Sequence, residues 1–230
     1  GHDVTTNGNT RAVPIYQTTS YVFKNSEQAA NLFSLKELGF IYTRLNNPTN
    51  QILQDRLAAV EGGIGAVVFA SGTAAIATGL LTLLKAGDHI VASSSLYGGT
   101  YNLLSVTLPR FGITTTFVDA SNADNFGTAI QENTRAFFVE SLGNPKLDVL
   151  DLEAISAHAK IAEVPFIVDN TVATPILLNP IKHGADIVIH SLTKYIGGQG
   201  TSLGGAIIDA GTFNWANGKF PEFTEPSAGY

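Results

Sequence analysis

Strongly apolar runs recur along this chain, separated by stretches in which apolar residues follow helical spacing. Strands that are apolar on both faces are typical of a sheet covered by helices on both sides, and such sheets are mostly parallel. We therefore expect an α/β fold with a mostly parallel sheet. The expected strands are residues 66–70, 89–92, 113–118, 135–140, 165–168, 186–189 and 202–209. The expected helices are residues 48–61, 73–84, 98–110 and 151–163.

The same spacing predicts which residues face the core and where the sheet domain begins. Leu53, Leu57 and Val60 fall on one face of the first expected helix, which Gly62-Gly63 ends. The residues before this helix are polar and are expected to be extended. We therefore expect an extended arm over residues 1–48 and a large domain over residues 49–230.

The composition excludes several classes of partner and site. The net charge of −6 gives no electrostatic reason to expect nucleic acid or an anionic membrane as a partner. The absence of cysteine excludes disulfides, thiol nucleophiles and cysteine-ligated metals, and the five histidines lack metal-site spacing. The longest apolar stretch, residues 76–84, is too short to span a membrane, and no signal peptide begins the chain, so we expect the cytoplasm. Because methionine is also absent, we expect the chain to be part of a longer protein.

Four polar residues stand where expected strands end: Ser71, Glu140, Asp169 and Ser191. Ligands of such sheets bind at the carboxyl ends of the strands, where helix N-termini also point. Ser71-Gly72-Thr73 begins a helix, so its first backbone amides are suited to a phosphate group. The alternative is that Ser71 is an ordinary helix cap.

Lys194 and Asp169 form the pair that indicates the chemistry. Each follows a buried strand, and Lys194 lies between Thr193 and the flexible Gly197-Gly198. A lysine can bond to the aldehyde of pyridoxal 5'-phosphate (PLP), and a buried carboxylate can keep the ring nitrogen of PLP protonated. Separately, each residue has an ordinary reading as a turn lysine or a loop-capping aspartate. Together they predict a PLP site.

An aromatic and a basic residue are further candidates. Tyr97 follows an expected strand and is suited to stacking on a planar cofactor, although a packed aromatic would explain it equally well. Tyr42 and Arg44 precede the first expected helix. An arginine fork suits phosphate, and a surface pair in a loop is the alternative.

Other nucleotide and hydrolase motifs do not fit. Residues 198–204 read GxGxxxG, one residue longer than a dinucleotide fingerprint, and they precede a strand rather than a helix. No lysine is followed by Ser or Thr, which excludes a P-loop, and no serine lies in a GxSxG elbow.

These residues lie in motifs that resemble the Cys/Met-metabolism family of PLP enzymes, and the resemblance covers essentially the whole chain. The motifs are Tyr42-Thr43-Arg44, Asn47-Pro48-Thr49, Ala70-Ser71-Gly72, Leu96-Tyr97-Gly98-Gly99-Thr100, Asn144-Pro145, Val168-Asp169-Asn170-Thr171 and His190-Ser191-Leu192-Thr193-Lys194. The family implies the large domain of a fold type I, aspartate aminotransferase-like transferase. It also implies that the C-terminal small domain, with the arginine that binds the substrate carboxylate, is absent from this chain.

The resemblance implies a role for each candidate residue. Lys194 bonds to PLP and then moves protons, Asp169 pairs with the ring nitrogen, and Tyr97 stacks on the ring. The implied catalytic residues are Lys194, Tyr97, Asp169 and Tyr42. The implied cofactor-binding residues are Lys194, Asp169, Tyr97, Gly72, Thr73, Ser191, Thr193, Tyr42, Arg44, Asn144 and Thr171, with Tyr42 and Arg44 reaching in from a neighbouring subunit.

Within the family, residues 11–21 and 211–221 resemble the members that make homocysteine from O-acetylhomoserine. This implies a γ-replacement in which acetate leaves Cγ and sulfide or methanethiol adds. The related alternatives are cystathionine γ-synthase, cystathionine γ-lyase and methionine γ-lyase activity. A further alternative is a non-catalytic PLP-binding fragment or paralogue. The resemblance also implies a homotetramer of catalytic dimers, and it leaves open whether free sulfide, methanethiol or a sulfur-carrier protein brings the sulfur.

Overall fold

The computed structural model describes residues 2–6 and 8–226, which form two compact units divided between Leu57 and Ala58. The first unit contains helix α1 (Ser26–Phe33), and helix α2 (Pro48–Glu61) runs from the first unit into the second. Asn47 Nδ2 in the first unit donates to Tyr16 O, and Thr49 Oγ1 donates to Pro14 O. These side-chain bonds fasten the irregular segment around residue 15 to the start of α2.

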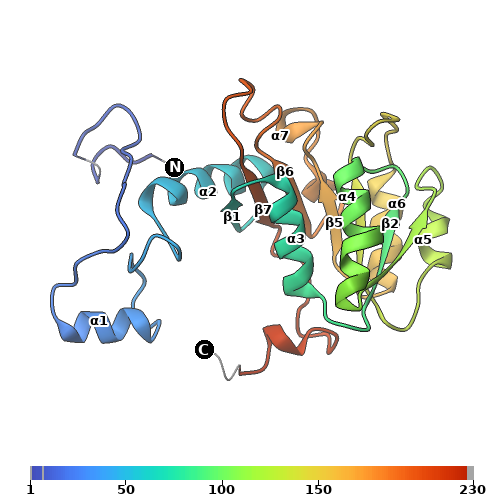
Figure 1. Cartoon of the computed structure of the whole chain (residues 1–230), viewed down its shortest axis with the longest axis horizontal. Coiled ribbons are helices and arrows are strands. Elements are labelled where there is room, and N and C mark those ends of the chain that lie inside the picture. The colour runs from blue at the N-terminus through green and yellow to red at the C-terminus, as the bar shows by residue number, and fades with distance from the viewer. Residues whose placement is uncertain (1, 7, 227–230) are drawn as a thin grey trace. The chain divides into compact units, whose positions relative to one another are not determined.

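The second unit is built on a seven-stranded sheet with the order β1-β7-β6-β5-β4-β2-β3 (Figure 1). Its strands are β1 (Gly65–Phe69), β2 (His89–Ser93), β3 (Thr114–Val118), β4 (Thr134–Glu140), β5 (Phe166–Asp169), β6 (Ile187–Ser191) and β7 (Gly205–Asp209). The neighbouring strands from β3 to β6 pair in parallel, whereas β7 is antiparallel to both β6 and β1. The mostly parallel sheet predicted from the apolar runs is confirmed.

Helices and short turns connect the strands. The helices of this unit are α3 (Gly72–Leu83), α4 (Gly98–Asn102), α5 (Asp124–Thr128), α6 (Leu152–Ile161) and α7 (Thr174–Leu177). A π turn (Leu103–Thr107) and 3-10 turns (Leu108–Phe111, Pro180–His183 and Pro221–Phe223) complete the unit. In the part of the chain that the structure describes, no helix is both long and apolar enough to cross a membrane.

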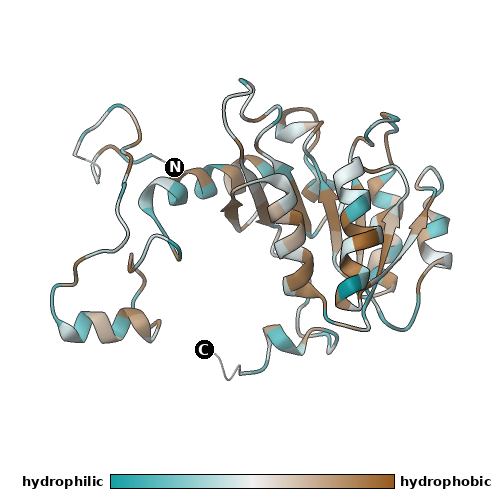
Figure 2. Ribbon diagram, viewed as in Figure 1, coloured by the Kyte–Doolittle hydropathy of each residue, from teal (hydrophilic) through white to brown (hydrophobic). Residues whose placement is uncertain are grey.

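Both faces of the sheet are covered. Phe137 and Phe138 are neighbours in β4 and so point to opposite faces, yet both are fully buried. Phe138 belongs to the main core, which includes Leu80 of α3, and Phe137 packs against Phe126 of α5. Figure 2 shows the corresponding apolar colour along the strands and α3. The continuous apolar runs in the sequence are explained by this two-sided burial.

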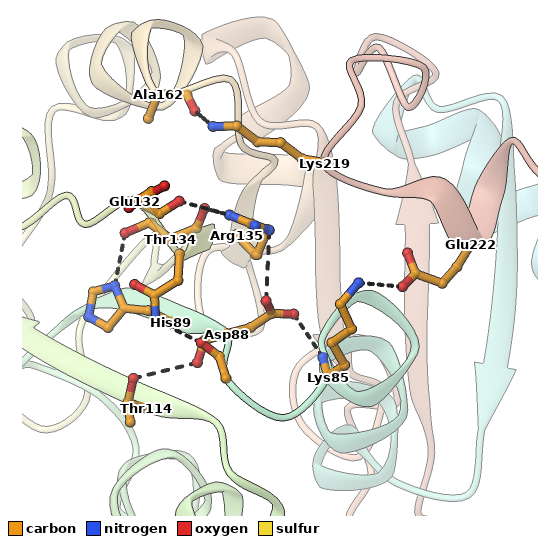
Figure 3. Close-up of polar contacts among 12 residues, drawn as sticks. Lys85, Asp88, His89, Thr114, Glu132, Thr134, Arg135, Ala162, Lys219 and Glu222 are labelled. Carbon is orange, nitrogen blue, oxygen red and sulfur yellow. Dashed lines mark hydrogen bonds and ion pairs between the residues drawn. The ribbon is translucent and has the colours of Figure 1, made fainter.

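Polar contacts fix the edge of the sheet at which β2 and β4 begin (Figure 3). Asp88 Oδ1 lies 3.8 Å from Arg135 Nε, and its Oδ2 accepts a hydrogen bond from the Lys85 backbone. The Lys85 ammonium bonds to Glu222 at 2.7 Å, which ties the 3-10 turn Pro221–Phe223 to the loop between α3 and β2. This edge is therefore structural, and it lies opposite the carboxyl ends of the parallel strands.

After β7 ends at Asp209, the chain leaves the sheet and forms an aromatic cluster. Phe213, Trp215, Phe220 and Phe223 pack edge to face or tilted, with ring centroids 4.7 to 6.5 Å apart. Phe220 is 1% exposed and lies at the centre of this cluster.

Four local expectations are wrong. Residues 98–110 are helical but do not form one α-helix. The α-helical pattern gives way to a π turn at Leu103 and then to a 3-10 turn at Leu108, where Pro109 has no N–H to donate. The opening is not extended throughout, since Asn25 caps α1 through a bond from the Gln28 N–H. Tyr42 and Arg44 therefore follow a helix.

The predicted buried face of α2 is also wrong. Leu57 is buried, but Leu53 and Val60 are 40% and 49% exposed. The hydrophobic period identified the helix correctly, whereas burial depends on which neighbour packs against each face, and the period does not contain that information.

Candidate active site

A pocket of about 770 Å³ opens at the carboxyl ends of β4, β5 and β6 within the second unit. Nine residues predicted from the sequence line this pocket: Gly72, Thr73, Tyr97, Asn144, Asp169, Thr171, Ser191, Thr193 and Lys194. Tyr42 and Arg44 lie in the first unit, where the Arg44 guanidinium carbon is 5.1 Å from the centre of the Tyr42 ring. Their contribution to the site remains a prediction.

The start of α3 forms a narrow cradle at one end of the pocket. The Ser71 side chain accepts a hydrogen bond from the Ala74 N–H at 3.1 Å, so Ser71 is indeed a helix cap. A Cβ on Gly72 would stand 2.7 Å from Ser191 Cβ, and a Cβ on Gly205 would collide with the Ser71 carbonyl. The backbone at the N-terminus of this 12-residue helix is therefore held close to β6 and β7. The helix dipole at this position favours an anion such as a phosphate.

Asp169 ends β5, is 9% exposed and is oriented by Thr171. Its Oδ1 accepts hydrogen bonds from the Thr171 N–H at 3.0 Å and from the Thr171 hydroxyl. The same hydroxyl accepts a bond from the Ser191 N–H at 2.8 Å, which links Asp169 to β6. Burial raises the pKa of Asp169, and the bonds from Thr171 together with the charge of His190 act in the opposite direction. A cation at this end of the pocket would favour the ionised carboxylate.

Lys194 lies in the segment that leaves β6, and its side chain is exposed to the pocket. Its backbone N–H donates to Ser191 O, and its carbonyl accepts from the Gly198 N–H at 2.8 Å. The neighbouring Thr193 hydroxyl accepts from the Gly204 N–H at 3.1 Å. These bonds close the segment between β6 and β7 into a compact loop, so the lysine projects from an anchored backbone.

The residues that line the pocket fit PLP. The cradle at α3 suits its phosphate, buried Asp169 suits its ring nitrogen, and Lys194 offers an amine to its aldehyde. Within residues 2–6 and 8–226, by contrast, no group of three or more potential ligands could hold a metal ion. The arrangement can therefore bind PLP and move a proton next to it.

Glu140 is a pocket residue to which the sequence assigned no role. It ends β4, is 5% exposed, and its two carboxylate oxygens accept bonds from the Tyr97 N–H at 2.7 Å and the Asn144 N–H at 3.1 Å. Burial raises the pKa of Glu140 to about 7. Its place at a strand end was the one signal in the sequence.

A third buried carboxylate, Glu61, lies outside the lining of the pocket. Glu61 ends α2, is fully buried, and its Oε1 is hydrogen-bonded to Nε2 of His190 in β6. Its Oε1 also accepts from Asn170 Nδ2 at 3.2 Å, and Asn170 Oδ1 accepts from the Ser141 hydroxyl at 2.8 Å. His190 is thus packed near the end of β6, and the role of Glu61 as its partner was not predicted.

Comparison with known proteins agrees with this geometry. Residues 1–225 match the family described as Cys/Met metabolism PLP-dependent enzyme. The chain belongs to this family. Its cofactor is accordingly PLP, and its fold is that of the fold type I large domain, as the sequence motifs implied.

Named relatives narrow the comparison. O-acetyl-L-homoserine sulfhydrylase of Leptospira meyeri is 60% identical over 220 residues, covering 96% of this chain and 50% of the relative. Homocysteine synthase of Schizosaccharomyces pombe is 53% identical over 223 residues, covering 96% and 52%. The chain thus spans about half the length of the curated relatives it matches.

Two solved structures share the fold. A crystal structure of an O-acetylhomoserine (thiol)-lyase from Campylobacter jejuni superposes with a TM-score of 0.87 at 48% identity, over 90% of this chain and 51% of that one. That protein carries a pyridoxyl-lysine monophosphate. Cystathionine γ-lyase of Lactobacillus plantarum, complexed with L-serine, has a TM-score of 0.82 at 33% identity, over 89% and 51%.

Proposed function

We propose that the protein containing this chain converts O-acetylhomoserine and sulfide, or methanethiol, into homocysteine, or methionine, and acetate. The observation that carries the proposal is the gathering of nine predicted residues around one pocket, in a chain 48 to 60% identical to relatives named for this substrate. The cystathionine γ-lyase structure is less similar, at 33% identity. The γ-lyase and γ-synthase reactions therefore remain the alternatives.

In this proposal, Lys194, Asp169 and the phosphate cradle each have a definite task. When bound, PLP supplies an electron sink that makes protons on neighbouring substrate carbons acidic. Lys194 removes and returns these protons as general base and general acid. Asp169, held by Thr171, keeps a positive charge on the ring nitrogen. The cradle at Gly72 and Ser191 holds the phosphate, so that Lys194 and the reacting carbons stay in register.

The test supplies the purified full-length protein with O-acetylhomoserine and one sulfur acceptor at a time. We expect homocysteine with sulfide, methionine with methanethiol, and stoichiometric acetate. Cysteine as the acceptor, giving cystathionine, would indicate a γ-synthase, and release of 2-oxobutanoate without an acceptor would indicate a γ-lyase. If free sulfide and methanethiol are poor acceptors, addition of a thiocarboxylate carrier protein tests the remaining sulfur source. No product with any acceptor would favour a non-catalytic PLP-binding protein.

The role of Lys194 has a spectroscopic test. The bound cofactor should give an absorbance band at about 420 nm that is lost in Lys194→Ala. Lys182→Ala, which removes an exposed lysine outside this pocket, should retain the band. Retention of the band in Lys194→Ala would show that another amine binds the cofactor.

The arm, residues 1–48, is proposed to contact a neighbouring subunit of a homotetramer and to deliver Tyr42 and Arg44 to its site. The support is the exposure of apolar arm residues, since Ile15 is 83%, Val22 100% and Leu38 90% exposed. Such side chains are normally covered by a partner when they gather on one segment. Light scattering after gel filtration measures the subunit number, and a monomer would contradict the proposal.

Mixing two inactive variants tests the shared site directly. Arg44→Ala and Lys194→Ala should each be inactive, whereas a mixed oligomer contains sites in which both residues are intact. We expect about a quarter of wild-type activity after the variants are dissociated and reassembled together. Activity no higher than in the separate variants would show that Arg44 acts within its own chain.

The proposed location of the protein is the cytoplasm, which cell fractionation would test.

A further inference from the structure

One carboxylate joins the two loops that border the pocket on either side of β4. Glu140 Oε1 accepts from the Tyr97 N–H at 2.7 Å, in the loop after β2, and its Oε2 accepts from the Asn144 N–H at 3.1 Å, in the loop after β4. Because both oxygens are engaged, a shift of either loop breaks a hydrogen bond to this carboxylate, which is charged above about pH 7. Such bonds are stronger than those between neutral groups.

A second carboxylate, Asp148, which does not line the pocket, fastens the same two loops. Asp148 Oδ1 accepts from the Ser95 hydroxyl at 2.7 Å, and the Asp148 carbonyl accepts from the Gly143 N–H at 3.1 Å. An isolated bridge between Leu142 and Val149 folds the later loop back on itself. The loops are therefore held at two points, of which only Glu140 lies on the pocket wall.

The position of Glu140 is electrostatically unfavourable. It is 5% exposed, and the charged groups that act on it, Asp169 from β5 and Asp148 from the loop after β4, are both acidic. In the described part of the chain, the ion pairs do not include Glu140. A buried carboxylate without a cation costs free energy, and two backbone N–H donors offset only part of that cost. A neutral residue at this position would cost less free energy to bury, so the presence of Glu140 indicates that its two hydrogen bonds have a role.

Each loop that Glu140 joins carries one residue that faces the cofactor space. Tyr97 is 52% exposed and lines the pocket, as does Asn144. We propose that Glu140 is a positioning residue that sets the spacing between Tyr97 and Asn144 and thereby fixes the orientation of the cofactor ring between them. This inference rests on the proposed function only in taking the cofactor to be bound in this pocket. It goes beyond that function by assigning the geometry of the ring to a residue that does not itself react.

The test replaces Glu140 by Gln in the full-length protein. The Gln amide keeps one acceptor oxygen but turns an N–H₂ toward the second backbone donor, so one bond is lost. We expect the Tyr97 or Asn144 amide to exchange about 10- to 100-fold faster with deuterium, which is the loss of one hydrogen bond to a charged group. The visible circular dichroism of bound PLP, measured per cofactor, should change in amplitude by more than about a third because the ring is no longer fixed.

Glu132→Gln is the matched control. It makes the same chemical change on an exposed residue just before β4, and it should leave exchange and dichroism as in the wild type. Ser95→Ala removes the other fastening point and should speed exchange around residues 142–149 without affecting the Tyr97 amide. Unchanged exchange and dichroism in Glu140→Gln, or changes no larger than in Glu132→Gln, would overturn the proposal.

Two further measurements keep the test decisive. If Glu140→Gln does not fold, Glu140→Asp keeps the charge but is too short to reach both donors, and the same two readouts apply. If neither variant folds, unprotected Tyr97 and Asn144 amides in the wild type would overturn the proposal, and protected ones would support it. Deuterium exchange requires no turnover. An enzyme inactive with O-acetylhomoserine would therefore contradict the proposed function while leaving the Glu140 inference to be judged by exchange and dichroism.

Discussion

The most direct test of the phosphate cradle is Gly72→Ala. The added methyl group would lie 2.7 Å from Ser191 Cβ and 2.9 Å from Ser191 Cα, whereas ordinary van der Waals contact begins at 3.4 Å. Ser191 cannot easily move away, because its N–H donates to the Thr171 hydroxyl at 2.8 Å and it pairs with Gly205 across the β6–β7 ladder. The substitution must therefore displace either the start of α3 or the strand end that carries Ser191.

The magnitude follows from the cost of overpacking. Inserting a methyl group into a closely packed site costs about 1 to 3 kcal/mol. If this cost falls on the cradle, the Kd for PLP should rise roughly 5- to 150-fold, because each 1.4 kcal/mol is about tenfold in affinity. The assay is a titration of the apoprotein with PLP, followed by absorbance, with far-UV circular dichroism to confirm the fold.

The matched control for this substitution is Gly98→Ala. Gly98 is likewise the first residue of a helix, but an added Cβ there would meet nothing within 4 Å. We expect its PLP affinity to stay within about twofold of wild type. A Gly72→Ala protein that folds and binds PLP as tightly as the Gly98→Ala protein would refute the assignment of this helix start as the phosphate site.

The remaining predictions concern a hydroxyl, a titration and the aromatic cluster. Thr171→Val removes the hydroxyl that donates to Asp169, and it should weaken PLP binding by about 1 to 2 kcal/mol, or roughly 5- to 30-fold in a PLP titration. The control Thr82→Val, at an exposed threonine, should leave the PLP affinity unchanged. Because burial raises the pKa of Glu140 from 4.5 to about 7, the folded apoprotein binds this proton more tightly than the unfolded chain does, so the stabilisation is fully present below pH 4.5 and is lost as the pH rises through 7. The free energy of unfolding of the apoprotein, measured in urea, should therefore fall by about 3 kcal/mol over this pH range, and Glu140→Gln should not show this fall. An equal pH dependence in the variant would contradict the raised pKa of Glu140. Phe220→Ala should destabilise the protein by about 3 to 5 kcal/mol in the same assay, and the 43%-exposed Phe223→Ala by clearly less, with equal losses arguing against a buried core at this position.

The strands were predictable because a strand that is buried on both faces consists almost entirely of apolar residues. The orientation of β7 was not predictable, since residues 205–209 are as apolar as a parallel strand would be. Its direction follows from the connection after β6, which is a loop without a crossover helix. The pattern of apolar residues thus identified the strands, while the short connection between β6 and β7 determined the direction of β7.

The predictable part of the site consists of residues whose side chains have recognisable chemistry at strand ends, such as Lys194 and Asp169. Glu140 was missed because its partners are backbone amides, which leave no mark in the sequence. Glu61 was missed because its partner, His190, lies on the sixth strand, far along the chain. Residues whose roles depend on sequence-distant or backbone partners become visible only when the fold is known.

The pairing of β1 with β7 has a consequence for biosynthesis. The first strand of the sheet to be translated has the last one as its neighbour, so β1 must wait for nearly the whole domain to leave the ribosome before it joins the sheet. The cradle for phosphate needs Gly72, which begins α3 after β1, beside Ser191, which ends β6. A nascent chain released before β7 would therefore lack a binding site for the cofactor. During synthesis, the point at which the chain first binds PLP would therefore indicate when β1 and β7 have paired.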